Sequence, residues 1–237
     1  MPLQNFVYKG FWQVLDWVYP PICASCGEPG YRICPICYEK INFLHGNLCQ
    51  ICGCSIKKIS KKICDICCDN NPPYDGIRSL AYYEGVIREC VHALKYKNNQ
   101  SLGDTFSELL VKLIRRENWH INFVVPVPLS EERYHERGYN QASLLAKPLA
   151  ARLSLTFNPY ALKRIRHTAS QVGLSAHERH QNVIGAFEAE TDLVRGKSLL
   201  IVDDVMTTGA TMKACAQALK KAGAKSAYGV VLARHSS

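Results

Sequence analysis

Two adjacent carboxylates, Asp203 and Asp204, stand where an apolar run ends and a hydroxyl-rich run begins. Residues 199–202 are apolar, and paired carboxylates at the end of a buried strand are costly unless they meet hydroxyls, a cation or hydrogen-bond donors. A ribose diol and Mg²⁺ would supply those partners. The run that follows offers short hydroxyls and a glycine for close backbone approach to a 5-phosphate. Its residues are Thr207, Thr208, Gly209, Ala210 and Thr211.

The position of this run in a strand-to-helix turn supports a ligand site. The apolar residues fit a buried parallel strand, and ligands of open α/β sheets collect at the carboxyl ends of such strands. A helix is expected over 212–222, and the free N–H groups at its start favour an anion. One end of phosphoribosyl pyrophosphate (PRPP) has this chemistry. In the structural alternative, the aspartates only cap the following helix.

Twelve cysteines form a second chemical feature, and all but Cys90 and Cys215 lie between Cys23 and Cys68. Two residues between thiolates let one tight turn present both sulfurs to one ion, and two turns complete a tetrahedral site. A closed Cys₄ shell leaves no position for water, so two structural Zn²⁺ ions are predicted. Their expected ligands are Cys23, Cys26, Cys34, Cys37, Cys49, Cys52, Cys64 and Cys67.

The pairing of these ligands is open at this point. The sequential arrangement, with the first four thiols on one ion and the last four on the other, needs only short loops, but the spacing also allows a cross-braced arrangement. Cys54 and Cys68 adjoin the pairs and are either spare or substitutes for a neighbouring ligand. Cys90 and Cys215 are expected to pack as small apolar residues.

The uneven cysteine content divides the 237 residues into parts. We expect an N-terminal amphipathic helix over 1–20, a cysteine-rich domain over 21–71 and an α/β domain over 76–237. Lys9, Gln13 and Asp16 interrupt the apolar residues of the first segment, so neither a secretory signal nor a membrane span is expected. A cytoplasmic location is the corresponding prediction.

The α/β domain shows alternating strand and helix patterns. Between the strand expected over 123–128 and the helix expected over 142–153 lies a polar loop, 130–141. The remaining expected strands are 77–83, 183–187, 226–233 and one near 162, and the other expected helices are 85–96 and 102–116.

Positive charge collects in the loops of this domain. The formal net charge is +9, and between residues 137 and 181 Glu178 is the single acidic residue. Arg137 follows the strand at 123–128, and Arg164 and Arg166 begin a long polar excursion of the kind that forms lids and binding loops. Such charge attracts phosphate, either pyrophosphate or nucleic acid, although a solvated loop carries the same charge for solubility alone.

Residues 199–211 resemble the signature of type I phosphoribosyltransferases, and the whole chain resembles the ComF family of competence proteins. Two family motifs match: Arg137-Gly-Tyr-Asn-Gln, with His135 in place of an arginine, and Arg164-x-Arg166-x-Thr-x-x-Gln171. The resemblance implies an α/β fold with a mostly parallel sheet flanked by helices, preceded by a double zinc ribbon. It implies PRPP binding with Mg²⁺ at Asp203 and Asp204, and pyrophosphate or loop contacts from Arg137, Arg164 and Arg166.

ComF relatives are implicated in natural transformation, where they work beside a DNA-translocating helicase on incoming single-stranded DNA. The resemblance therefore predicts a role in DNA uptake, with Tyr134 and Tyr139 as stacking platforms for bases. An active phosphoribosyltransferase is the alternative. It would transfer the phosphoribosyl group of PRPP to an amine or nucleobase and release pyrophosphate, but the sequence shows no acceptor site.

Overall fold

The computed structural model describes residues 20–97, 99–166 and 183–236. The predicted N-terminal helix and the loop residues from 167 to 182, including Gln171, lie outside the described residues. The strands are β1 (Gly76–Tyr82), β2 (Phe123–Pro126), β3 (Thr156–Phe157), β4 (Leu162–Arg164), β5 (Phe187–Ala189), β6 (Ser198–Met206) and β7 (Ser226–Arg234). The helices are α2 (Pro35–Glu39), α3 (Asp65–Asn70), α4 (Gly85–Tyr96), α5 (Ser101–Ile114), α6 (Glu131–Arg137), α7 (Gln141–Leu153), α9 (Thr191–Val194) and α10 (Ala210–Lys221).

The main sheet has five strands in the order β1-β7-β6-β2-β3, and all of its pairings are parallel. β4 and β5 form a separate antiparallel pair. The predicted α/β fold with a mostly parallel sheet is confirmed. Because the chain continues from β2 to β3 on one side and β6 lies on the other, a crevice opens at the carboxyl ends of β2 and β6.

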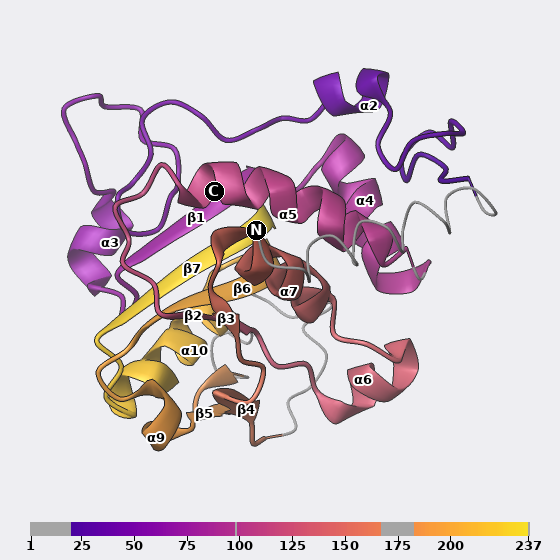
Figure 1. Cartoon of the computed structure of the whole chain (residues 1–237). Helices are drawn as coiled ribbons and strands as arrows, with labels where there is room; N and C mark the ends of the chain where they lie inside the picture. The colour runs from indigo at the N-terminus through magenta and orange to yellow at the C-terminus, as the bar shows by residue number, and fades with distance from the viewer. Residues whose placement is uncertain (1–19, 98, 167–182, 237) are drawn as a thin grey trace.

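Helices cover both faces of the sheet, with α4, α5 and α7 on one face and α10 on the other (Figure 1). The residues of β6 alternate accordingly. Leu200 and Val202 join the core beneath α4, α5 and α7, whereas Leu199 and Ile201 join the core beneath α10. A strand buried on both faces reads as a continuous apolar run, which explains the composition of residues 199–202.

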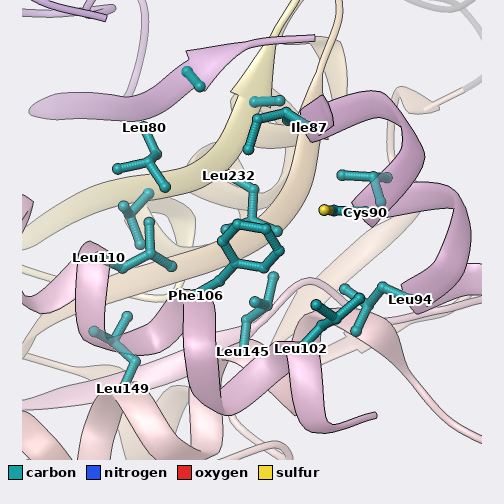
Figure 2. Packing of buried hydrophobic residues seen from close by; sticks show 14 of the residues in the cluster. Leu80, Ile87, Cys90, Leu94, Leu102, Phe106, Leu110, Leu145, Leu149 and Leu232 are labelled. Carbon is teal, nitrogen blue, oxygen red and sulfur yellow. The ribbon is translucent and has the colours of Figure 1, made fainter. Parts of the chain in front are cut away.

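Phe106 of α5 lies at the centre of the larger core (Figure 2). Its ring is fully buried and is surrounded by leucines of α5 and α7 and by Leu232 of β7. α5 and α7 approach closely at Gly103, where an added Cβ would lie 2.4 Å from the carbonyl oxygen of Leu144. This packing fixes α5 and α7 in one layer with α4, the helix that reaches the crevice.

The cysteine-rich segment, residues 21–71, covers the β1 edge of the sheet. The Leu44 amide donates to the Leu80 carbonyl (3.0 Å), and the Tyr82 amide donates to the Asn42 carbonyl (2.9 Å). Further along β1, the Ile77 amide donates to the carbonyl of Ile51 (2.6 Å). The segment therefore satisfies backbone groups that an open edge strand would leave unpaired.

Arg78 of β1 fastens the same edge through its side chain. Its guanidinium donates two 2.7 Å hydrogen bonds to the Glu117 carboxylate and one of 3.1 Å to the Gln50 carbonyl. Gly53 lies close by at φ +67°, and a Cβ there would lie 2.5 Å from the Ile77 carbonyl oxygen. Glycine is therefore required where the cysteine-rich segment touches β1.

A short helix, α6, occupies part of the segment that the sequence predicts as a polar loop, so that prediction was wrong for residues 131–137. Glu131 and Glu132 lie in its first turn, Arg137 lies in its last turn, and Gly138 ends it in the left-handed conformation. These are favourable helix-end residues. The helix buries none of its side chains, so the sequence lacks the apolar periodicity that identifies longer helices.

Within the described residues, the longest apolar helices fall short of the length and hydropathy that a membrane crossing requires.

Candidate ligand cleft and metal sites

A cleft of about 350 Å³ opens at the carboxyl ends of β6 and β2. Its floor is formed by residues 203–212, which comprise the end of β6, the following loop and the start of α10. Arg133 and Gln141 line it from the segment after β2, and Lys95 lines it from the last turn of α4. The predicted aspartates and hydroxyl-rich loop are therefore brought together in one cleft.

The two aspartates leave β6 toward opposite faces because side chains alternate along a strand. Asp204 follows the parity of Leu200 and Val202, so it faces the helical layer that contains α4. There the Lys95 Nζ atom lies 2.8 Å from its Oδ2 atom. The side chains are 20% exposed for Lys95 and 5% exposed for Asp204, so the ion pair is largely shielded from water.

The pKa values of Asp204 and Asp203 are shifted in opposite directions. Burial raises the pKa of the Asp204 carboxyl, but the charge and hydrogen bond of Lys95 outweigh burial and hold the pKa below its usual range. At Asp203, burial and then the adjacent Asp204 charge raise the pKa well above its usual range. Asp203 is therefore the carboxyl whose ionised form a bound cation or a hydroxyl donor would stabilise most.

The loop after β6 has the backbone form of an anion site. Gly209 has φ +77° and precedes the first residue of α10, a helix of 12 residues. The free N–H groups of this helix start lie beside the hydroxyl-bearing loop, and the Ala210 amide donates to Thr208 Oγ1 at 3.4 Å. N–H groups, a helix dipole and hydroxyls together favour a phosphate at this position.

The predicted basic residues occupy different places. Arg164 lines the cleft, with its guanidinium 5.7 Å from the ring centroid of Phe187. Arg137 is not among the lining residues. It donates to Gln141 Oε1 at 3.0 Å, and its guanidinium lies 5.0 Å from the Tyr96 ring centroid. Arg166 is exposed two residues after β4, just before the undescribed part of the loop.

Sequence reasoning gave no role in the cleft to Lys95. Arg133 and Gln141 belong to the predicted polar loop 130–141, which the family resemblance associates with pyrophosphate, but neither was chosen as a candidate site residue. Lys95 follows the buried Leu94 in an amphipathic helix, a position that usually signals only a solvated surface. Its partner is more than a hundred residues away in the sequence. No local pattern could reveal this pair.

The first four thiols form one group, Cys23, Cys26, Cys34 and Cys37, whose sulfur atoms all lie within 4.8 Å of one another. A second group with the same spread contains Cys49, Cys52, Cys54 and Cys64. The two groups fit the binding of two zinc ions, and each draws on neighbouring stretches of chain, as the sequential arrangement predicts.

We name residues 23–37 the first zinc knuckle and residues 49–67 the second, and their hydrogen bonds follow the same pattern. The Cys34 amide donates to Cys23 Sγ, and the Cys64 amide donates to Cys49 Sγ, each at 3.4 Å. Burial raises the pKa of both acceptor thiols, but backbone N–H donors outweigh it and lower the pKa to about 6 for Cys23 and about 7 for Cys49. These donors stabilise the thiolate form that binds zinc.

Comparison of the two knuckles indicates whether Cys54 or Cys67 is the zinc ligand. The Cys54 carbonyl accepts a hydrogen bond from the Cys49 amide, just as the Glu28 carbonyl accepts one from the Cys23 amide. Cys67 is the third residue of α3, as Cys37 is of α2, and its thiol contacts Cys52 and Cys64. This equivalence predicts Cys67 as the ligand and Cys54 as a non-ligand, although the tight thiol group contains Cys54.

The second knuckle lies close to the loop after β6. A groove of about 160 Å³ is lined by residues 208–210 and Lys213 on one side and by α3 and Tyr74 on the other. Residues 20–71 do not line the main cleft itself. The cysteine-rich segment therefore reaches the outer side of the candidate phosphate loop and does not cover the cleft.

Comparison with known proteins agrees with this division of the chain. Residues 14–68 match the double zinc ribbon domain, and residues 138–237 match the phosphoribosyl transferase domain. The chain is thus a double zinc ribbon joined to a domain of the phosphoribosyltransferase fold.

Three curated relatives extend over most of the chain. DNA utilization protein YhgH of Salmonella typhimurium is 33% identical over 214 residues, which are 86% of this chain and 93% of that protein. Competence protein F of Haemophilus influenzae is 29% identical, over 81% and 85% of the two chains. Competence protein ComFC of Bacillus subtilis is 25% identical, over 83% and 81%. The chain belongs to the ComF family of competence proteins.

The equivalence of the two knuckles predicts which thiol completes the second zinc site. We expect Cys67→Ser to lose one zinc ion per chain and Cys54→Ser to retain both ions, because Cys54 occupies the place of Glu28. Zinc content measured by plasma mass spectrometry on purified protein tests this. Loss of an ion from Cys54→Ser, with full retention in Cys67→Ser, would contradict the assignment.

The Lys95–Asp204 ion pair predicts strong energetic coupling. Lys95→Met should destabilise the protein by about 3 kcal/mol because it leaves a buried carboxylate without a partner. In a double-mutant cycle with Asp204→Asn, we expect a coupling free energy of about 1–3 kcal/mol in urea unfolding.

Lys97→Met is the matched control, since Lys97 is exposed at the end of the same helix and its loss should change stability by less than about 0.5 kcal/mol. Strictly additive effects of the two cleft variants would show that the ion pair contributes nothing.

Proposed function

We propose that this protein handles incoming single-stranded DNA during DNA uptake and that its cleft binds PRPP with Mg²⁺. The names of its relatives connect the family with competence and DNA utilization. The single observation that carries the ligand proposal is the joining of Asp203, Asp204 and the loop 207–211 in one cleft. A DNA-translocating helicase is the protein partner that the family resemblance implies.

The cleft offers a complementary group for each part of PRPP. The carboxylates of Asp203 and Asp204 suit the ribose hydroxyls and Mg²⁺, a hard cation that prefers oxygen ligands. The N–H groups and hydroxyls of residues 207–211 suit the 5-phosphate. Arg133 and Arg164, which line the cleft, suit the pyrophosphate. Lys95 stabilises the ionised form of Asp204, so the carboxylate is charged before a ligand binds.

A surface beside the cleft has the features of a single-strand contact. Tyr96 is 59% exposed with the Arg137 guanidinium over its ring, and Tyr134 of α6 is 52% exposed. Exposed rings beside cations provide base stacking and phosphate contacts. Tyr139 has a different role, because it is half-buried and its hydroxyl donates to the Leu94 carbonyl at 2.7 Å. It ties the end of α6 to the end of α4.

An active phosphoribosyltransferase is the second candidate function, favoured by the same cleft. The reaction would join the anomeric carbon to an amine or nucleobase and release pyrophosphate. Mg²⁺, when bound, would balance the charge of the pyrophosphate group. This chain's own residues would orient the sugar at Asp203 and Asp204 and stabilise developing charge through Arg133 and Arg164.

The PRPP proposal predicts Mg²⁺-dependent binding in titration calorimetry. Asp203→Asn should weaken PRPP binding more than tenfold, because the substitution removes a ligand for the cation and the ribose. Asp192→Asn, at an exposed position of α9, is the matched control and should bind normally.

Failure of the unaltered protein to bind PRPP with Mg²⁺ present would exclude the proposed ligand. A radiolabelled pyrophosphate-release assay over amines and bases then separates the two functions. Release identifies a transferase, and silence from a protein that binds PRPP leaves the binding role.

The DNA proposal predicts two separable effects on affinity for an oligothymidylate. Tyr96→Leu should weaken binding about five- to hundredfold because it removes a stacking ring, and it should change the salt dependence little because every positive charge is kept. Arg137→Gln should reduce the slope of log affinity against log salt by about 0.7, the value for one phosphate contact on a single strand.

Lys197→Gln, just before β6 at the other end of the sheet, is the charge-matched control. Wild-type slopes in Arg137→Gln and unchanged affinity in Tyr96→Leu would remove this surface from the proposal.

A further inference from the structure

Two aromatic side chains in the main cleft have no role in the binding of PRPP described above. Tyr83 and His235 both line the cleft, and their ring centroids lie 4.9 Å apart at an interplanar angle of 40°. The other lining side chains divide between charged, amide or hydroxyl groups and aliphatic groups. A pair of rings at one side of this cleft suits a ligand with a flat apolar face.

Strand ends fix both rings in place. The Tyr83 amide donates to the Arg234 carbonyl (2.8 Å), and the His235 amide donates to the Met206 carbonyl (3.1 Å). Tyr83 directly follows β1, His235 directly follows β7, and Met206 ends β6. The backbone of both residues is thus hydrogen-bonded to the sheet, that of Tyr83 to β7 and that of His235 to β6, the strand that carries the aspartates.

The strand order places the rings opposite the basic side of the cleft. In the sequence β1-β7-β6-β2, the aspartates on β6 stand between the aromatic side, at β1 and β7, and the side that follows β2, with Arg133 and Gln141. A sugar held over the aspartates would therefore face cationic and amide groups on one flank and rings on the other.

We propose that Tyr83 and His235 form a stacking subsite for a nucleobase or a similar flat heteroaromatic ring, attached to or placed beside the ribose phosphate in the cleft. The inference rests on the proposed sugar-phosphate site and assigns the class of compound bound next to it. A volume of about 350 Å³ lies within the range of small-molecule sites, about 300–1,000 Å³. The subsite is where an acceptor base, or the base of a bound nucleotide, stacks.

The test compares two kinds of probe: ribose 5-phosphate, which has no nucleobase, and the nucleoside monophosphates AMP and UMP, which have one. Titration with Mg²⁺ should show that at least one monophosphate binds about ten- to hundredfold more tightly than ribose 5-phosphate. Tyr83→Leu should bring this affinity ratio close to 1, and Tyr83→Phe, which keeps the ring, should preserve most of it.

His235→Leu provides a second variant at an exposed position, so the test stands if Tyr83→Leu fails to fold. Equal affinity for the two kinds of probe, or a ratio that survives both leucine variants, would overturn the subsite. A chain that binds neither ribose 5-phosphate nor a monophosphate would contradict the proposed sugar-phosphate site as well. The two failures are therefore distinguishable.

Discussion

The buried ion pair between Lys95 and Asp204 is the constraint on which the cleft depends. A carboxylate at the end of a strand buried on both faces is costly unless a cation, hydroxyls or hydrogen-bond donors lie against it, and at Asp204 the cation is Lys95. The 2.8 Å contact therefore links α4 to β6 and fixes the side of the sheet on which the charge lies. Asp203 lies one residue earlier and on the other face. Strand alternation and the position of a single helix therefore give one carboxyl group that is ion-paired with a lysine and one whose pKa is raised.

In the zinc knuckles, too, the protein stabilises the charged form of the binding groups before a ligand binds. Backbone N–H donors lower the pKa of Cys23 and Cys49, so these thiols favour the charged form that a metal requires. A segment of this size has little core of its own, and zinc together with its contacts to β1 stabilises it. Arg78 joins the two parts, because its guanidinium reaches the second knuckle and Glu117 at once.

The sequence predicted the class of fold and the central residues of the cleft because that information is local. Residues 199–211 carry strand, carboxylates and loop in one run, and pairs of cysteines with two residues between them define the knuckles. The sequence could not show Lys95 opposite Asp204, nor Tyr83 and His235 beside each other, because tertiary packing alone makes these contacts. The helix α6 was missed for the opposite reason, since a short helix that buries none of its side chains leaves no apolar pattern. The choice between Cys54 and Cys67 required the comparison of two hydrogen-bonded repeats.

The covering of β1 has a consequence for self-association. A parallel sheet ending in a bare strand offers a template on which another chain can grow. Here the hydrogen bonds from Leu44 and to Asn42 occupy that template, and at the far side β3 is only two residues long. Neither edge of the main sheet therefore favours strand pairing with another molecule. We therefore expect that copies of this protein do not associate by extending the main sheet, because the docked metal-binding segment covers its β1 edge.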